Sequence, residues 1–157
     1  LPHGNYQKLV VEEMKTKPKS GNIVTEDGEI LGKHTGLFNY TIGQRKGLGI
    51  AYKHPLYVIG FNGERNEVIV GPNERLFTNR MICKFYNFLD DTIHKELKAE
   101  GKIRYAANQS PCTARILDDD TMEVIFDEPQ RAITPGQSVA FYNGTQLLGG
   151  AVIDRVC

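Results

Sequence analysis

The stretch TMEVIFD, residues Thr121 to Asp127, alternates apolar and polar side chains in a way that only one regular element explains. Successive side chains of a β-strand point to opposite faces, so Met122, Val124 and Phe126 share one face and the residues between them share the other. One face can therefore pack on a core while the other meets solvent. This pattern predicts a half-buried strand of an antiparallel sheet.

Similar short strand patterns surround this stretch and are separated by turns. The dipeptide Asn143-Gly144 predicts a tight hairpin turn before the last strand, whereas residues 95–100 are polar all round and predict a short surface helix or a loop. Strands at this spacing without intervening helices favour a closed barrel or a sandwich. The expected strands cover residues 77–89, 101–107, 112–117, 121–127, 137–142 and 145–155.

The first part of the chain has a different pattern. Residues 6–14 predict a short helix and residues 15–21 a basic linker interrupted by proline,. Two hairpins follow, at residues 22–33 and 55–71, with Asp27-Gly28 supplying the first turn. His34 is expected to be a polar loop residue rather than a ligand. We therefore expect a small mixed α/β module over residues 1–74 and a β-barrel domain over residues 75–157.

Composition and charge exclude several classes of protein. The 157 residues carry 19 basic and 19 acidic side chains, which argues against a uniformly basic nucleic-acid surface,. Residues 1–54 nevertheless hold eight Lys and Arg against five Asp and Glu, so an anion-binding face should draw mainly on this part,. The chain shows no membrane-spanning run and no signal peptide, and we expect no membrane partner. The missing initiator methionine leads us to expect a piece of a longer protein.

Neither the cysteines nor the acidic residues form a catalytic or metal-binding pattern. Cys83, Cys112 and Cys157 contain no C-x-x-C pair, which fits a reducing cytoplasm,. Cys83 and Cys112 are expected to be small buried hydrophobic residues. The run Asp118-Asp119-Asp120 is expected to be a solvated turn, because three consecutive carboxylates cannot all point at one ion. The sequence therefore predicts no catalytic residue and no metal site.

One glycine-rich stretch is unusual for a mere connection. In TIGQRKGLGI, residues Thr41 to Ile50, three glycines flank Gln44, Arg45 and Lys46. Glycines permit backbone angles that a Cβ forbids and let a partner approach closely. The stretch can be an anion-facing loop, most plausibly for a nucleic-acid backbone, or a connection with solvated charges. Its spacing matches neither the P-loop nor the dinucleotide fingerprint.

This stretch also closely resembles a signature of the tRNA-specific 2-thiouridylases, which place sulfur on the wobble uridine of certain tRNAs. Five further blocks resemble the same family in the same order and bring the resemblance to nearly the whole chain. They are GNIVTEDGEILGKHTGL (21–37), NEVIVG (66–71), KIRY (102–105), FDEPQRAITPGQSVAFY (126–142) and LGGAVI (148–153).

The resemblance implies a six-stranded barrel of the translation-factor type after a central module. It also implies that the catalytic cysteines and the Ser-Gly-Gly-x-Asp-Ser loop for ATP with Mg belong to a missing N-terminal domain, because neither motif occurs here. This chain alone is then expected to hold no cofactor and to be inactive. The implied partners are tRNA and, through the parent enzyme, a sulfur-donor protein.

Six residues are candidates for tRNA contact. Arg104 and Tyr105 in KIRY, and Gln137 in ITPGQ, match positions of the family that touch the tRNA, although Ala106 and Ala107 follow where the family commonly has another basic residue. Arg can offer a fork to phosphate, Tyr a stacking face, and Gln a neutral donor. Gln44, Arg45 and Lys46 are assigned to tRNA or to positioning the missing domain. The competing hypothesis is a scaffold barrel that binds a protein rather than RNA.

Overall fold

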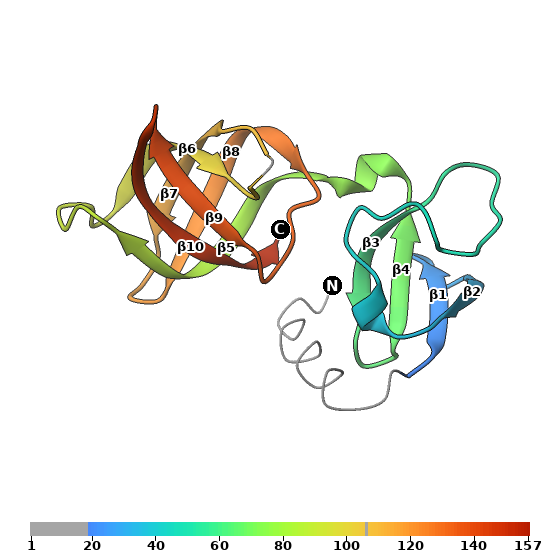
Figure 1. Ribbon diagram of the computed structural model, residues 1–157. Helices are drawn as coiled ribbons and strands as arrows, with labels where there is room; N and C mark the ends of the chain where they lie inside the picture. Colours follow the sequence, from blue (N-terminus) through green and yellow to red (C-terminus); the bar gives the residue numbers. More distant parts are fainter. Residues whose placement is uncertain (1–18, 106) are drawn as a thin grey trace. The chain divides into compact units, whose positions relative to one another are not determined.

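A computed structural model describes residues 19–105 and 107–157, and it divides the chain into two compact units after Phe77 (Figure 1). Each unit has its own buried cluster of apolar side chains. The helix expected over residues 6–14 lies outside the described residues, as do residues 15–18 of the expected linker.

The first unit is a four-stranded sheet in the order β2-β1-β4-β3. Its strands pair as the two expected antiparallel hairpins, which are confirmed. A parallel pairing of β1 with β4, which the sequence did not predict, joins them into one mixed sheet. The elements are β1 (Gly21–Thr25), β2 (Ile30–His34), the 3₁₀ helix η1 (Leu37–Asn39), β3 (Tyr57–Asn62), β4 (Glu67–Gly71) and the 3₁₀ helix η2 (Asn73–Leu76).

The first hairpin turns at a glycine, as expected. Gly28 has a φ of 88°, and its N–H donates to the Thr25 carbonyl oxygen at 3.0 Å. This region of φ is strongly unfavourable for a residue with a Cβ, so Asp27-Gly28 determines where the chain reverses.

His34 differs from the expectation of a polar loop residue. It ends β2 and is buried, with 1% of its surface exposed. Its Nε2 lies 2.7 Å from the Asn66 carbonyl oxygen, and its Nδ1 accepts from the Gly36 N–H at 3.0 Å. Both ring nitrogens thus have partners, which is how a buried imidazole avoids the cost of desolvation. Because these partners are backbone groups, no pattern of side chains in the sequence could predict them.

The second unit is a closed six-stranded antiparallel barrel in the order β10-β5-β8-β7-β6-β9, which confirms the expected fold class. Figure 1 shows its strands in green to red. The register of β7 with β8 runs from Cys112 opposite Phe126 to Ile116 opposite Met122. The strands are β5 (Phe77–Phe88), β6 (Glu96–Lys102), β7 (Ser110–Ile116), β8 (Thr121–Arg131), β9 (Ser138–Asn143) and β10 (Gln146–Val156).

The position of β6 corrects the sequence prediction. Residues 96–100 form a strand rather than a surface helix or loop, so the strand expected over 101–107 starts earlier and ends at Lys102. Leu97 and Ala99 pack against the barrel core, and Gly101 is buried on the same face. The alternation is therefore present, but the charged residues that alternate with Leu97, Ala99 and Gly101 made the segment look polar.

The barrel core contains the face of β8 that the alternation predicted. Met122, Val124 and Phe126 are between 0% and 1% exposed, so this prediction is confirmed. Glu123 points the other way, yet it is only 6% exposed because two arginines cover it. The buried cluster comprises Met81, Cys83, Ile103, Cys112, Ala114, Met122, Val124, Phe126, Ile133, Val139, Phe141, Ala151 and Ile153.

Candidate nucleic-acid interface

The glycine-rich stretch forms a loop between η1 and β3, called the glycine loop below and defined as residues 41–56. Gly43, Gly47 and Gly49 have φ values of 90°, 79° and 65°, in the region that favours glycine,. The loop is fixed to the sheet because the Gly43 N–H donates to the Val58 carbonyl oxygen at 2.8 Å. The Val58 N–H donates to the Gln44 carbonyl oxygen at 2.9 Å.

The Gln44 side chain is engaged inside this loop. Its Oε1 accepts from the Thr41 N–H at 3.0 Å, and its Nε2 donates to the Lys46 carbonyl oxygen at 2.9 Å. Both ends of the amide therefore link backbone groups on either side of the turn. The geometry gives Gln44 a part in shaping the loop that presents Arg45 and Lys46.

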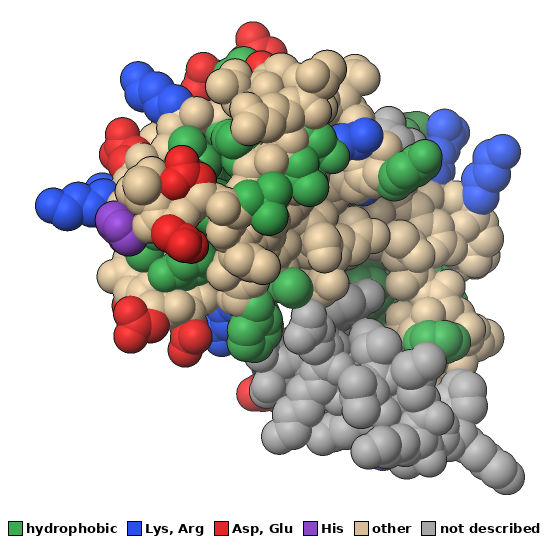
Figure 2. Space-filling model, turned by 60° about the vertical axis from the view of Figure 1, so that its left-hand side comes forward, with side chains coloured by type: hydrophobic (Ala, Val, Ile, Leu, Met, Phe, Trp, Pro, Cys, Tyr) green, Lys and Arg blue, Asp and Glu red, His purple; other side chains and the backbone are tan. Residues whose placement is uncertain are grey.

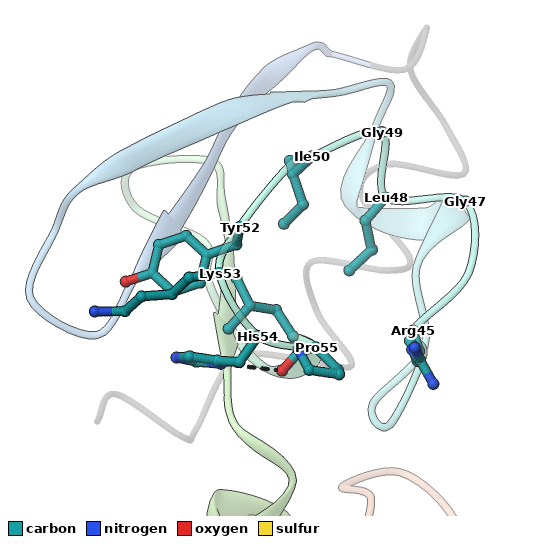
Figure 3. Close-up of a pocket in the computed structure, with 10 residues that line it drawn as sticks. Arg45, Gly47, Leu48, Gly49, Ile50, Tyr52, Lys53, His54 and Pro55 are labelled. Carbon is teal, nitrogen blue, oxygen red and sulfur yellow. Dashed lines mark hydrogen bonds between the residues drawn. The ribbon is translucent and has the colours of Figure 1, made fainter.

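Arg45 and Lys46 are exposed on the glycine loop. No described residue forms an ion pair or a hydrogen bond with the side chain of either one. Beside Arg45 lies an open pocket of about 470 Å³ (Figure 3). The pocket is lined by Arg45, Gly47, Leu48, Gly49, Ile50, Tyr52, Lys53, His54, Pro55 and Leu56.

Sequence reasoning missed part of this site. Tyr52, Lys53 and His54 were not candidates, although a cation between two aromatic rings begins three residues after the third glycine of the motif. That juxtaposition was the available signal. The sequence does not show that the loop reverses direction. This reversal brings Arg45 and these three residues into the lining of one pocket.

Arg104, in the barrel unit, is exposed but its guanidinium contacts the backbone of a distant turn. Nη2 donates to the Arg131 carbonyl oxygen at 2.7 Å and Nη1 to the Ala132 carbonyl oxygen at 3.3 Å. Ala132 has a φ of 58°, which is costly for a residue with a Cβ,. Thr134 Oγ1 also donates to the Ala132 carbonyl oxygen, at 2.9 Å. Arg104 therefore stabilises the turn that leads to Gln137.

Tyr105 and Gln137 present their side chains to solvent. Tyr105 is 96% exposed, and Lys102 Nζ lies 5.4 Å from the centroid of its ring. The Gln137 backbone is fixed, since its N–H donates to the Thr134 carbonyl oxygen at 3.2 Å and its carbonyl accepts from the Ile153 N–H at 2.8 Å. A stacking face and an amide are thus available on the barrel.

Several other basic side chains are already matched to carboxylates. Arg80 and Arg115 both contact Glu123, at 2.6 Å and 2.9 Å, and Lys84 lies 3.7 Å from Asp154. In Figure 2 the acidic side chains lie over the left part and the top of the face, with some basic side chains among them, and other basic side chains lie at the upper right. This distribution agrees with the balanced net charge.

Cys83 and Cys112 are small buried residues of the barrel, as predicted. Both lie in the barrel core, and burial raises the pKa of each thiol to about 12. The reactive thiolate is therefore scarce at neutral pH. Cys157 is exposed.

The acidic run forms the expected exposed turn. Asp118 Oδ1 accepts from the N–H groups of Asp120 and Thr121, at 2.9 Å and 2.8 Å, and these hydrogen bonds lower the pKa of the Asp118 carboxyl group. In the part of the chain that the structure describes, no three His, Cys, Asp or Glu residues come together as metal ligands. Within the same part, no helix combines the length and apolar character needed to cross a membrane.

Two family models match the chain, one in each unit. Residues 8–72 match the tRNA methyl transferase PRC-barrel domain, and residues 78–153 match the aminomethyltransferase beta-barrel domain. Both matches follow the division of the chain into a sheet unit and a barrel unit.

The chain is also similar to curated proteins along almost its whole length. It is 45% identical to the tRNA-specific 2-thiouridylase MnmA 1 of Clostridium tetani, over 99% of this chain and 43% of that protein. It is 44% identical to the tRNA-specific 2-thiouridylase MnmA of Clostridioides difficile, over 96% of this chain and 42% of that protein. The corresponding protein of Geotalea uraniireducens is 42% identical, over 99% of this chain and 41% of its own length. The chain spans about two fifths of the length of these relatives, and it belongs to the family of the tRNA-specific 2-thiouridylases.

Proposed function

We propose that this chain is the tRNA-binding central and C-terminal part of an ATP-dependent tRNA-uridine 2-sulfurtransferase that acts in the cytoplasm. In the complete enzyme, ATP adenylates the 2-oxygen of the wobble uridine and releases pyrophosphate. The outer sulfur of a cysteine persulfide then attacks C2 and displaces AMP. The thiol of a second cysteine attacks the inner sulfur of the resulting S–S bond, so that a disulfide forms between the two cysteines and the thiocarbonyl is left on the uridine. We assign ATP with Mg, the catalytic cysteines and contact with a sulfur-donor protein to a part of the enzyme outside this chain. The chain on its own then positions RNA and performs no chemistry.

The observation that carries this proposal is that the cations of the glycine loop are exposed and that their side chains have no partner among the described residues. Arg45 and Lys46 are exposed, and within the described residues neither has a carboxylate or hydrogen-bond partner for its side chain. Cations held without an internal partner can neutralise phosphates and release the counterions that surround RNA. Gln44 supports them through its hydrogen bonds on both sides of the turn.

The barrel residues contribute in a second way under this proposal. Tyr105 offers a ring for stacking, and Gln137 offers a neutral donor or acceptor for a phosphate or a sugar. Arg104 holds the turn that precedes Gln137 and retains further N–H groups for a phosphate, because a guanidinium carries five donors,.

The test is the binding of the 157-residue chain to tRNA at a series of salt concentrations. Affinity should fall steeply with salt, and Arg104→Ala should reduce the slope of log K against log salt by about one unit. A combined variant of Arg104, Gln137, Arg45 and Lys46 should lose most of the binding. If binding is insensitive to salt and to the combined variant, the proposal fails and the scaffold hypothesis stands. In addition, the chain should release no AMP and transfer no sulfur.

A further inference from the structure

The pocket beside Arg45 contains apolar and aromatic side chains in addition to cations that could bind phosphate. Its volume of about 470 Å³ lies within the range of small-molecule sites, about 300–1,000 Å³,. Its lining comes from one continuous stretch, residues 45–56, in which the sequence has no Asp or Glu. The pocket therefore has no negative side chain of its own to repel an anion.

The floor of the pocket includes apolar side chains, although most of its exposed lining is polar. Leu48 and Leu56 line it and are each only 6% exposed, so they form part of the core of the sheet unit. Figure 3 shows the side chains of Leu48 and Ile50 pointing from the loop backbone into the hollow. A bare phosphate gains nothing from such a surface, whereas a flat organic ring can pack on it.

The rim combines aromatic rings with a cation. The rings of Tyr52 and His54 meet edge to face, with centroids 4.9 Å apart and planes at 88°. Lys53 lies between them in sequence, and in Figure 3 its ammonium group extends to the same side as the Tyr52 hydroxyl, while Arg45 lies at the opposite end of the pocket. The side chain of Lys53 has no ion-pair or hydrogen-bond partner within residues 19–105 and 107–157. Tyr52 is 39% exposed, so its ring is accessible to a ligand.

From this arrangement we propose that the pocket binds one unpaired nucleotide of an RNA strand. The base stacks on the exposed ring of Tyr52, the apolar floor receives its edge, and Lys53 and Arg45 neutralise the neighbouring phosphates. Aromatic platforms beside cations are how proteins bind single-stranded nucleic acid, because every base has a π-face. The inference rests on the proposed function and adds to it the kind of RNA segment that this site takes.

The same features argue against an acidic protein surface as the occupant. Carboxylates would use Arg45 and Lys53 but would leave the apolar floor and the exposed ring of Tyr52 without a matching group. A nucleotide matches each of these groups, because its phosphates pair with the two cations and its base packs on the apolar floor and on the ring of Tyr52. We therefore choose RNA, and binding of an acidic peptide becomes an outcome that contradicts the inference.

The experiment measures fluorescence anisotropy of a labelled, unstructured five-nucleotide uridine RNA titrated with the 157-residue chain. Tyr52→Ala should weaken binding about tenfold, within the range of base–aromatic stacking. Tyr52→Phe, which keeps the ring, should stay within about threefold of the unchanged chain. Lys53→Gln should lower the salt slope by about 0.7, the value for one phosphate of a single strand. Phe85→Ala, an aromatic residue 69% exposed on the barrel, is the matched control and should leave affinity unchanged.

Competitors separate the possible occupants. Inorganic tripolyphosphate should displace the RNA weakly, and equally from the unchanged chain and from Tyr52→Ala. The inference is overturned if Tyr52→Ala binds like the unchanged chain, if Tyr52→Phe loses as much as Tyr52→Ala, or if penta-glutamate competes as well as unlabelled RNA. Circular dichroism checks that each variant is folded. If Tyr52→Ala proves to be unfolded, Lys53→Gln tests the site independently.

Failure of this inference and failure of the proposed function give different results. If the chain binds tRNA with a steep salt dependence while Tyr52→Ala changes nothing, the pocket assignment alone is wrong. If the unchanged chain does not bind tRNA at all, the proposed function is wrong, and the pocket assignment that rests on it is wrong as well.

Discussion

The glycine loop and the barrel use the same residue types for different purposes. In the loop, Gly49 is required by its φ of 65°, and a Cβ there would meet no atom within 4 Å. In the barrel, Gly149 is required by crowding, because a Cβ would collide with the Asn87 carbonyl oxygen and lie 2.8 Å from the Phe88 ring. The loop glycine is needed for its backbone angle, whereas the barrel glycine is needed because β10 and β5 approach closely at that point.

The basic side chains of the two regions also differ, in whether the fold gives them a partner. Arg80 and Arg115 neutralise the buried Glu123, and Arg104 binds the backbone of a turn, so the fold already uses these side chains. Arg45 and Lys46 have no such partner among the residues described. A cation that the fold uses should matter for stability, whatever it adds to binding, and one that the fold leaves free should matter for binding alone. Each prediction below tests one side of this comparison.

The largest expected effect is that of Gly149→Ala. Its added methyl group would force the backbones of β10 and β5 apart, and such overpacking should cost about 3 kcal/mol of unfolding free energy,. Urea denaturation measures the loss. Gly60→Ala in β3 is the control, because its Cβ meets nothing within 4 Å and its φ is not positive, so it should change stability by less than about 0.5 kcal/mol,. Equal effects at the two positions would contradict the crowding argument.

Gly49→Ala should cost about 1–2 kcal/mol, because a Cβ is strained at its φ even where space is available,. Gly49→Asn should cost less, since Asn tolerates this region of φ better. Urea denaturation of the two variants, followed by probes of the sheet unit, measures the difference. If Ala and Asn are both neutral, the loop does not depend on this backbone angle.

Arg104→Ala should lower the unfolding free energy by about 1 kcal/mol, because the Arg131 carbonyl oxygen loses the Arg104 donor and the Ala132 carbonyl oxygen keeps only Thr134 Oγ1,. Thermal unfolding measures this loss separately from any loss of tRNA binding. Arg155→Ala, an exposed arginine of β10, is the control and should stay within about 0.5 kcal/mol of the unchanged chain,. A neutral Arg104→Ala would mean that this guanidinium is as free as the cations of the loop.

Much of the fold could be predicted because strand alternation and turn residues are local signals. The inward face of Met122, Val124 and Phe126 identified the barrel, and Gly28 located the first hairpin turn. The segment Glu96–Lys102 was missed because four of its seven residues are charged and only Leu97 and Ala99 are apolar. The parallel pairing of β1 with β4 was missed because it joins segments more than forty residues apart without a local pattern.

The site could be predicted only where its residues share one motif. Arg45 and Lys46 lie between loop glycines, so their exposure followed from the sequence. The two hydrogen bonds of Arg104 could not be foreseen, because their acceptors are backbone carbonyls nearly thirty residues away. Tyr52 and Lys53 were missed because nothing in the sequence states that the loop folds back to form a pocket.

The most direct test of the account is the salt dependence of tRNA binding by the double variant Arg45→Gln/Lys46→Gln. Removing two free cations should lower the slope of log K against log salt by about two units. Unfolding free energy should stay within about 0.5 kcal/mol, because no described residue depends on these side chains. The control Lys95→Gln/Lys98→Gln, on exposed barrel positions, should leave the slope unchanged. An unchanged slope in the loop variant, or an equal drop in the control, would contradict the claim that the glycine loop binds RNA.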